Sequence, residues 1–322
     1  MRIYAFHSFA SVSHSPANLS SLTLVDAIAE ARMPRKTMAS GEPWLHDEVA
    51  RQMAKRLSLI RHPVKQWVDW SPSRGGWAGL PNVSAQWSDA KALLFEADPW
   101  LLRRSQKALQ PPWWKRWIGL GRTPQTMQTT GVNQEVDMVW CNMQLHMASD
   151  PLQGMRQWSQ ALRPDGFVMF SCLGPDSLIE LRQLYGAMGW PVAGAEWTDM
   201  HDWGDMLVHT GFAEPVMDME RITLTYQTAE DLLRDLRAWG RNLHPQRFAG
   251  TRAKGWRREL LNALESTRLL AQRQGQLSLS FEIIYGHAFK AAPSLAVKAL
   301  TRVDLSDMKQ MLRSGQNPGQ GS

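Results

Sequence analysis

Apolar and polar positions follow two clear periods in the middle of the chain. Residues 136–141 (VDMVWC) form an almost unbroken apolar run, which predicts a buried strand. A stripe at helical spacing follows within 151–162 and consists of Leu152, Met155, Trp158 and Leu162. The turn residues 163–166 (RPDG) end that helix and lead into a second apolar strand, 167–170 (FVMF). The pattern predicts a strand, a crossover helix and a parallel strand.

Similar patterns precede this unit. The segment 44–60 predicts an amphipathic helix, because four apolar residues share one face: Val49, Met53, Leu57 and Ile60. Short apolar runs at 64–70 and 91–95 predict two further strands. With the central unit they indicate an α/β fold whose parallel strands end at one carboxyl edge, where open sheets of this kind hold ligands.

The pattern changes after residue 210. Residues 216–226 and 277–287 alternate in the way of antiparallel strands, so we expect a hairpin that completes the sheet. The arginine-rich stretch between them, about 229–275, is typical of an inserted helical segment. The chain therefore divides into a partly ordered arm (1–42), a main domain (43–291) and a C-terminal helix with a flexible tail (292–322). One short helix is expected in the arm, over 20–32.

Composition adds bounds to this picture. Of the 322 residues, 43% are hydrophobic and 20% charged, as in an ordinary globular protein. No apolar run is long enough to span a bilayer, and the first residues lack the apolar stretch of a signal peptide. Cys141 and Cys172 fall in predicted buried strands, which favours a reducing cytoplasm over a disulfide framework. The net charge of +6 suggests an acidic partner: nucleic acid, a membrane surface or an acyl carrier protein.

Several short motifs occur in order along the chain. They are Asp137–Asn142 (DMVWCN), 162–166 (LRPDG), 171–178 (SCLGPDSL), 198–202 (TDMHD), 211–226 (GFAEPVMDMERITLTY) and 281–290 (FEIIYGHAFK). This set resembles the class I S-adenosylmethionine-dependent methyltransferases, and among them the malonyl-[acyl-carrier protein] O-methyltransferases of biotin synthesis. The resemblance covers roughly residues 44–290. It implies a Rossmann-like, seven-stranded sheet, mostly parallel, with an antiparallel last strand and a helical insertion before it.

The resemblance also implies S-adenosylmethionine as cofactor and a malonyl group on an acidic acyl carrier protein as substrate. The family's cofactor loop is an acid followed by three alternating glycines. Here Asp69 matches the acid and Gly75 the third glycine, whereas Ser71 and Ser73 replace the first two. Pro72 stands between the serines; its fixed φ and missing N–H predict that the usual cradle cannot form unaltered.

Two further cofactor contacts are implied. Glu96, with Pro99 and Leu102 behind it, matches the family's acid that binds both ribose hydroxyls. The alternative for Glu96 is an acid near the start of the next helix that stabilises its first turn. Gln125 stands where the family has an aspartate that reaches the adenine amino group.

The substrate side offers several candidates. Asn142, at the end of the 136–141 strand, could orient the cofactor or a substrate carboxylate. His146 and His201 lie in motif-bearing loops that we expect to face the pocket, although a lone histidine is often only structural. Tyr285 belongs to the YGHAFK motif, which either forms a rim over the substrate or packs the last strand.

A substrate carboxylate needs a cation, preferably an arginine that can bind both of its oxygens. Arg182 and Arg221 lie in family-like stretches, but such arginines are more often exposed or structural charges, and other arginines lie in the insert. No histidine and cysteine spacing matches a metal site, and the phosphate-binding G-x-x-x-x-G-K motif is absent.

Three functions remain open from the sequence. The first is the methyltransferase, favoured by the family motifs and the basic charge. The second is a catalytically impaired relative that binds a carrier or partner protein, favoured by the altered glycine loop and by Gln125. The third and weakest is nucleic-acid binding through residues 111–117 (PPWWKRW) and the arginine-rich insert, but neither carries a recognition motif. We expect no nucleic-acid partner.

Overall fold

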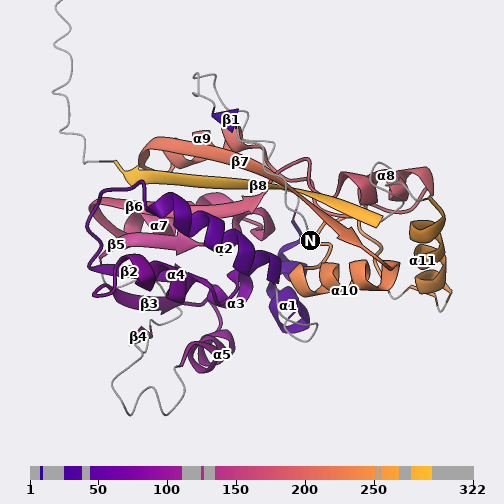
Figure 1. Ribbon diagram of the computed structural model, residues 1–322, viewed down its shortest axis with the longest axis horizontal. Coiled ribbons are helices and arrows are strands. Elements are labelled where there is room, and N and C mark those ends of the chain that lie inside the picture. Colours follow the sequence, from indigo (N-terminus) through magenta and orange to yellow (C-terminus); the bar gives the residue numbers. More distant parts are fainter. Residues whose placement is uncertain are drawn as a thin grey trace, which may run out of the picture.

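Helices cover both faces of one central sheet (Figure 1). The computed structural model describes residues 8–9, 25–37, 44–110, 125–126, 135–250, 252–253, 255–267 and 277–291. The strands are β1 (Ser8–Phe9), β2 (Gln66–Trp70), β3 (Lys91–Phe95), β4 (Gln125–Thr126), β5 (Val136–Cys141), β6 (Leu162–Leu173), β7 (Phe212–Tyr226) and β8 (Leu277–Lys290).

The helices alternate with the strands through the first half of the chain. They are α1 (Ala27–Thr37), α2 (Trp44–Leu57), α3 (Pro72–Gly75), α4 (Gly79–Gln86), α5 (Pro99–Leu109), α7 (Pro151–Ala161), α8 (Ile179–Ala187), α9 (Met200–His209), α10 (Ala229–Trp239) and α11 (Trp256–Thr267), with a 3-10 turn η2 (Leu145–Met147). Helices α10 and α11 lie between β7 and β8, so the helical insertion before the last strand is confirmed.

Within the described residues the strand order is β1-β7-β8-β6-β5-β2-β3-β4. Strands β4, β3, β2, β5 and β6 are parallel, and β8 runs antiparallel to both of its neighbours, β6 and β7. This is the predicted seven-stranded sheet with an antiparallel last strand. The strand count differs by one, because the backbone of Ser8 and Phe9 adds β1 antiparallel to β7. A two-residue strand has too little periodicity to be seen in the sequence.

Two apolar clusters hold the layers together. On one face, α2 and the insertion helices cover the sheet through residues such as Val49, Leu232 and Leu264. On the other face, Trp158 of α7 and Trp203 of α9 pack against the strands. Figure 1 shows α1, α3 and α10 near the end of the sheet where the parallel strands finish, and α8 farther out beside α11. Helices cover both faces of the sheet, so a ligand can bind at the edge where the parallel strands end.

Some predicted boundaries need correction. Helix α2 ends at Leu57, so Ile60 lies outside it. Helix α1 begins at Ala27, because the Asp26 carboxylate accepts hydrogen bonds from the N–H groups of Ile28 and Ala29, and it extends beyond the predicted end of 32. Residues 163–166 fall inside β6, but Val136 pairs with Leu162 and Met138 already with Phe167. The predicted turn is therefore an irregularity within the strand, and Asp165 has φ 64°.

Several predicted features lie outside the described residues. They include the PPWWKRW stretch, the C-terminal helix and tail, and most of the N-terminal arm. Within the described part of the chain, no helix is both long and apolar enough to cross a membrane.

Candidate active site

The ends of three adjacent parallel strands bring the predicted acids and amide together. Asp69 lies near the end of β2, Glu96 directly follows β3, and Asn142 directly follows β5. Strand β2 pairs with β3 on one side and β5 on the other, so the three side chains share one edge. All three are buried. The parallel register explains how residues so far apart in sequence meet here.

The altered glycine loop folds as a single helical turn. Ser71 has φ 55° and ψ 55°, in the left-handed region, and its N–H donates to the Phe95 carbonyl at 2.7 Å. Pro72 then opens α3, where its missing N–H costs nothing. The Ser71 carbonyl accepts from the N–H groups of Arg74 and Gly75 at 2.9 and 3.2 Å. A serine in the left-handed region is strained, and the surrounding contacts must hold it there.

The carboxylate of Glu96 accepts the hydrogen bonds that hold this turn. The Ser73 N–H donates to Glu96 Oε1 at 2.8 Å, and the Ser73 hydroxyl donates to Oε2 at 2.9 Å. The Ser105 hydroxyl of α5 donates to Oε1 at 2.7 Å. Burial raises the pKa of Glu96, and the donors from Ser105 and Ser73 oppose that rise. Both carboxylate oxygens are thus already engaged by the protein itself.

Asn142 joins the loop to α2 and β6. Its Nδ2 donates to the His46 carbonyl at 2.8 Å and to the Gly75 carbonyl, while the Ser171 hydroxyl donates to its Oδ1 at 2.7 Å. A Cβ added to Gly75 would lie 2.5 Å from the Asn142 carbonyl oxygen, so only glycine allows this close approach. The match of Gly75 to the family's third glycine therefore has a steric reason here.

Gln144 is a polar residue of this site that the sequence reasoning missed. Its Nε2 donates to the carbonyls of Trp70 and Ser71 at 2.6 and 2.7 Å, and so holds the end of β2 and the start of the loop. Ser105 was also missed, although it occupies a buried position four residues after the buried Leu101 in α5. A polar residue on the apolar face of a helix is a signal that could have identified it.

Two buried histidines face the same region. His46, in the first turn of α2, and His146, in η2, are both buried, and neither Nδ1 has a hydrogen-bond partner among the described residues. Burial lowers the pKa of His46 to about 4. Burial, with a further contribution from His46, lowers that of His146 to about 3. Both imidazoles are neutral at pH 7, so neither supplies a positive charge to the site.

This lowering predicts a pH-dependent stability. Between about pH 6.5 and about pH 4, both histidines bind protons in the unfolded chain but not in the folded chain. The free energy of unfolding therefore decreases as the pH is lowered through this range. In a His146→Gln variant, the free energy of unfolding should depend less steeply on pH, with a slope smaller by roughly 1.4 kcal/mol per pH unit in this range. Urea unfolding at pH 7, 6 and 5 measures it. The raised pKa values of Asp69 and Glu96 change the free energy of unfolding with pH in the opposite direction. Wild type and His146→Gln share this contribution, so it does not affect the comparison.

The exposed His209 supplies the control for that experiment. His209→Gln should keep the wild-type pH dependence of the free energy of unfolding. Equal slopes for wild type and His146→Gln would show that His146 becomes protonated in the folded protein near its ordinary pKa.

A cavity of about 280 Å³ adjoins His146. Its lining is mostly apolar and comes from η2, α8, the insertion and β8, for example from Leu181, Trp239 and Phe281. Arg237 and Arg241 of the insertion also line it. Burial, and then the neighbouring Arg237, lower the pKa of Arg241 from its ordinary value. The cavity therefore combines an apolar wall with two guanidinium groups beside the strand edge.

Helix α1 ties this edge to the insertion. Glu30 pairs with Arg74 of the altered loop at 3.1 Å and accepts a hydrogen bond from the Ser149 N–H at 2.9 Å. Asp26 pairs with Arg247 of the insertion at 2.8 Å. Part of the predicted N-terminal arm is thus folded against the site, although the domain division itself stays a prediction.

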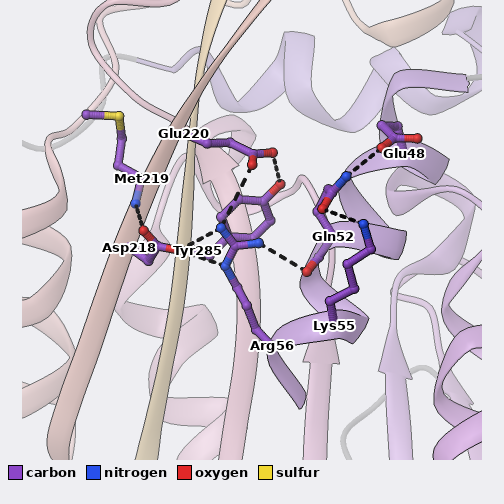
Figure 2. A network of polar contacts seen from close by, with 8 residues as sticks. All are labelled: Glu48, Gln52, Lys55, Arg56, Asp218, Met219, Glu220 and Tyr285. Atoms are coloured by element: carbon purple, nitrogen blue, oxygen red, sulfur yellow. Dashed lines mark hydrogen bonds and ion pairs between the residues drawn. The ribbon is translucent and has the colours of Figure 1, made fainter. Parts of the chain in front are cut away.

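Tyr285 belongs to a polar network of its own (Figure 2), although its backbone pairs with Ser171, the residue whose hydroxyl donates to Asn142. Its hydroxyl donates to Glu220 at 2.7 Å, and the Arg56 guanidinium lies 3.8 Å from its ring centroid. Arg56 also pairs with Asp218 at 2.6 Å. Arg56 is ten residues beyond His46 on α2, roughly 15 Å at the rise of an α-helix. Burial, and then Glu220, raise the pKa of Tyr285, which supports its packing role over the predicted catalytic one.

The remaining candidates have other surroundings. His201 is about half exposed in the first turn of α9 and pairs with Asp199 at 3.3 Å. Arg221 pairs with Asp176, both about half exposed, and Arg182 donates to the Pro175 carbonyl. The backbone of Gln125 pairs with Leu93 of β3, while its side chain lies outside the described residues. The structure therefore brings Asp69, Ser71, Ser73, Gly75, Glu96, Asn142 and His146 to one edge, and it places His201 and Tyr285 in separate contacts.

Several malonyl-[acyl-carrier protein] O-methyltransferases resemble this chain over most of its length. A malonyl-[acyl-carrier protein] O-methyltransferase from Laribacter hongkongensis is 34% identical over 255 residues, which cover 77% of this chain and 83% of the relative. One from Nitrosospira multiformis is 31% identical over 291 residues, covering 84% and 93%. No family model matches the chain. Among solved structures, the YcgJ protein from Bacillus subtilis aligns at 11% identity with a TM-score of 0.48, over 74% of this chain and 98% of its own. That likeness is too weak to add to the sequence comparison.

Proposed function

Because the chain belongs to the malonyl-[acyl-carrier protein] O-methyltransferase family, we propose that it methylates the free carboxylate of a malonyl group carried by an acyl carrier protein. The methyl donor is S-adenosylmethionine, and the product is the methyl ester that enters biotin synthesis. The family motifs that were recognised in the sequence agree with this function. The alternative, a carrier-binding module without catalysis, has the altered loop in its favour.

The polar groups at the strand edge fit the cofactor. Glu96 is a buried carboxylate whose two oxygens accept from the N–H and the hydroxyl of Ser73, and a ribose diol would use the same two acceptors. Asp69 has a buried Oδ2 without a hydrogen-bond partner among the described residues. Glu96 would hold the ribose, and the 71–75 backbone with Asn142 would face the methionine part. When bound, the cofactor supplies an electrophilic methyl group that a carboxylate oxygen can attack in line.

The site needs no general base. A carboxylate is already ionised at neutral pH, so the protein has to orient it and balance its charge rather than remove a proton. His46 and His146 are neutral at that pH and cannot balance the charge. The cation must come from another residue, and an arginine can bind both carboxylate oxygens.

We assign the malonyl group to the cavity beside His146, because two arginines line that cavity. Arg241 is half-buried in the lining, and its Nη1 donates to the carbonyls of Arg237 and Gly240, which fix the guanidinium. Apolar side chains exclude water around it, and a charge–charge contact is stronger in such surroundings. We therefore assign the malonyl carboxylate to Arg241, with Arg237 at the exposed side of the cavity.

The carrier protein is the proposed partner. Acyl carrier proteins are acidic, and this chain has a net charge of +6. On the insertion that lines the cavity, the side chains of Arg234, Arg237, Arg257 and Arg258 are exposed. Arg237 also lines the cavity, so the insertion places an exposed positive charge at the proposed substrate cavity.

Purified protein should convert malonyl-[acyl carrier protein] to its methyl ester in the presence of S-adenosylmethionine, with a mass increase of one methylene. Intact-protein mass spectrometry of the carrier measures this. Acetyl-[acyl carrier protein], which has no free carboxylate, is the matched negative substrate. If the malonyl carrier binds but gains no mass at saturating cofactor, the chain is a binding module and the catalytic proposal is wrong.

Replacing Arg241 by glutamine should raise the KM for the malonyl carrier by about tenfold or more, because a charged hydrogen bond to the carboxylate is lost. The dissociation constant of S-adenosylmethionine should stay within about twofold. Arg51→Gln is the control, because Arg51 is an exposed residue of α2, outside the insertion, and pairs with Glu48 of the same helix at 2.7 Å. Equal KM values for Arg241→Gln and Arg51→Gln would remove Arg241 from the substrate site.

A further inference from the structure

Ser73 presents two donors to one carboxylate. Its backbone N–H bonds one oxygen of Glu96 and its hydroxyl bonds the other, at 2.8 and 2.9 Å. A glycine at this position would offer an N–H but no hydroxyl. The second bond is therefore a property of the serine in this chain, and it forms because the loop folds as the α3 turn.

Glu96 has no exposed surface, so its oxygens have little capacity left for a ligand. A ribose offers two neighbouring hydroxyls, and each would need one of the same two oxygens. Simultaneous binding by the Ser73 hydroxyl and by a diol would crowd Oε2. From this geometry we propose that the Ser73 hydroxyl is an internal competitor of the cofactor's ribose on Glu96. This inference rests on the proposed function, in which S-adenosylmethionine is the methyl donor.

Other contacts hold the competing arrangement in place. Gln144 and Asn142 donate to loop carbonyls on either side of Ser73, those of Ser71 and Gly75. Arg74 is paired with Glu30 of α1. The loop is thus fixed at both ends and at its next residue, so the backbone keeps the Ser73 side chain within hydrogen-bond reach of Glu96. Binding of a ribose has to exchange this bond for its own.

The exchange lowers affinity without preventing binding. A hydrogen bond to a charged group contributes enough that its loss changes a binding constant by about tenfold. Removing the Ser73 hydroxyl should therefore strengthen binding, although most substitutions in a binding loop weaken it. The sign of this effect separates the proposal from a purely structural role for Ser73.

Isothermal titration calorimetry with S-adenosylmethionine and with S-adenosylhomocysteine tests it. Ser73→Ala should bind both about tenfold more tightly than wild type. Ser73→Thr keeps the hydroxyl and should bind as wild type does. Ser105→Ala is the matched control: it also removes a hydroxyl from Glu96, but one that is fully buried in α5, so no space opens for a ligand and binding should not become tighter.

Each outcome decides the proposal. The proposal is wrong if a folded Ser73→Ala variant binds S-adenosylmethionine as wild type does or more weakly. It is also wrong if neither wild type nor Ser73→Ala binds the cofactor, or if Ser105→Ala binds it more tightly by the same factor as Ser73→Ala. Thermal unfolding without ligand identifies any variant that fails to fold, and Ser73→Gly then takes the place of the alanine variant. Tighter binding without methylation of the malonyl carrier supports the role of Ser73 and refutes only the proposed reaction.

Discussion

Leucine in place of Asn142 should lower the affinity for S-adenosylmethionine by at least about a hundredfold and destabilise the fold by about 3 kcal/mol. Leucine has nearly the same shape but no polar atoms. It would leave the carbonyls of His46 and Gly75 without their donor and the Ser171 hydroxyl without its acceptor, all in a buried place. Each buried group that loses its partner costs about 1–3 kcal/mol. The altered loop loses the contact that positions Gly75, so cofactor binding falls with stability.

Calorimetric titration and urea unfolding measure the two effects separately. Asn262→Leu is the control, because Asn262 is an exposed residue of α11 and its replacement should change neither quantity much. An Asn142→Leu protein that binds the cofactor within about threefold of wild type would show that the loop is held by Gln144 and Glu96 alone. Asn142 would then be a structural residue outside the cofactor site.

The sequence was most informative at the strand ends. Lys91–Phe95 was predicted with the bounds that β3 has, and the apolar run 136–141 is β5. Buried parallel strands are nearly all apolar, so a polar residue at the end of one is conspicuous. Parallel strands also end at the same edge. The family resemblance had assigned Asp69, Glu96 and Asn142 to the cofactor, and the shared edge of the parallel strands explains why they meet.

Contacts between side chains that are far apart in the chain could not be predicted from the sequence. The replacement of two glycines by serines was visible, but the use of Ser73 as a donor to Glu96 depends on the α3 turn. His46 and His146 are 100 residues apart, and their mutual influence depends on how α2 packs beside η2. A local pattern specifies which face of an element is buried, but it does not specify which polar atoms meet across two elements.

The YGHAFK motif shows the same limit. Its residues were consistent with a rim over the substrate or with packing of the last strand. In the structure, β8 is a central strand, and Gly286 pairs with Phe170 of β6 and Met217 of β7. Tyr285 bonds Glu220 beneath Arg56. Both observations favour packing, and Gly286 provides the sharper test.

Exchange of Gly286 for valine should abolish folding, and exchange for alanine should destabilise the protein by about 1–3 kcal/mol. A Cβ at this position would overlap the ring of Phe170 and lie 2.9 Å from Met217 Sδ. Both neighbours are buried, so neither can move into solvent. Added volume in a close-packed interior forces side chains off their preferred rotamers or displaces the backbone. Urea unfolding of the alanine variant gives the magnitude, and circular dichroism shows whether the valine variant folds.

Gly154 provides the matched control, because it lies within α7 and a Cβ there meets nothing within 4 Å. Gly154→Ala should stabilise the protein by about 0.5–1 kcal/mol, the usual gain for alanine over glycine in a helix. If Gly286→Ala were as stable as wild type but lost methyl transfer to the malonyl carrier, the packing explanation would be wrong. The motif would then act on the substrate. A loss of stability with the KM for the malonyl carrier unchanged would instead assign Gly286 to the sheet alone.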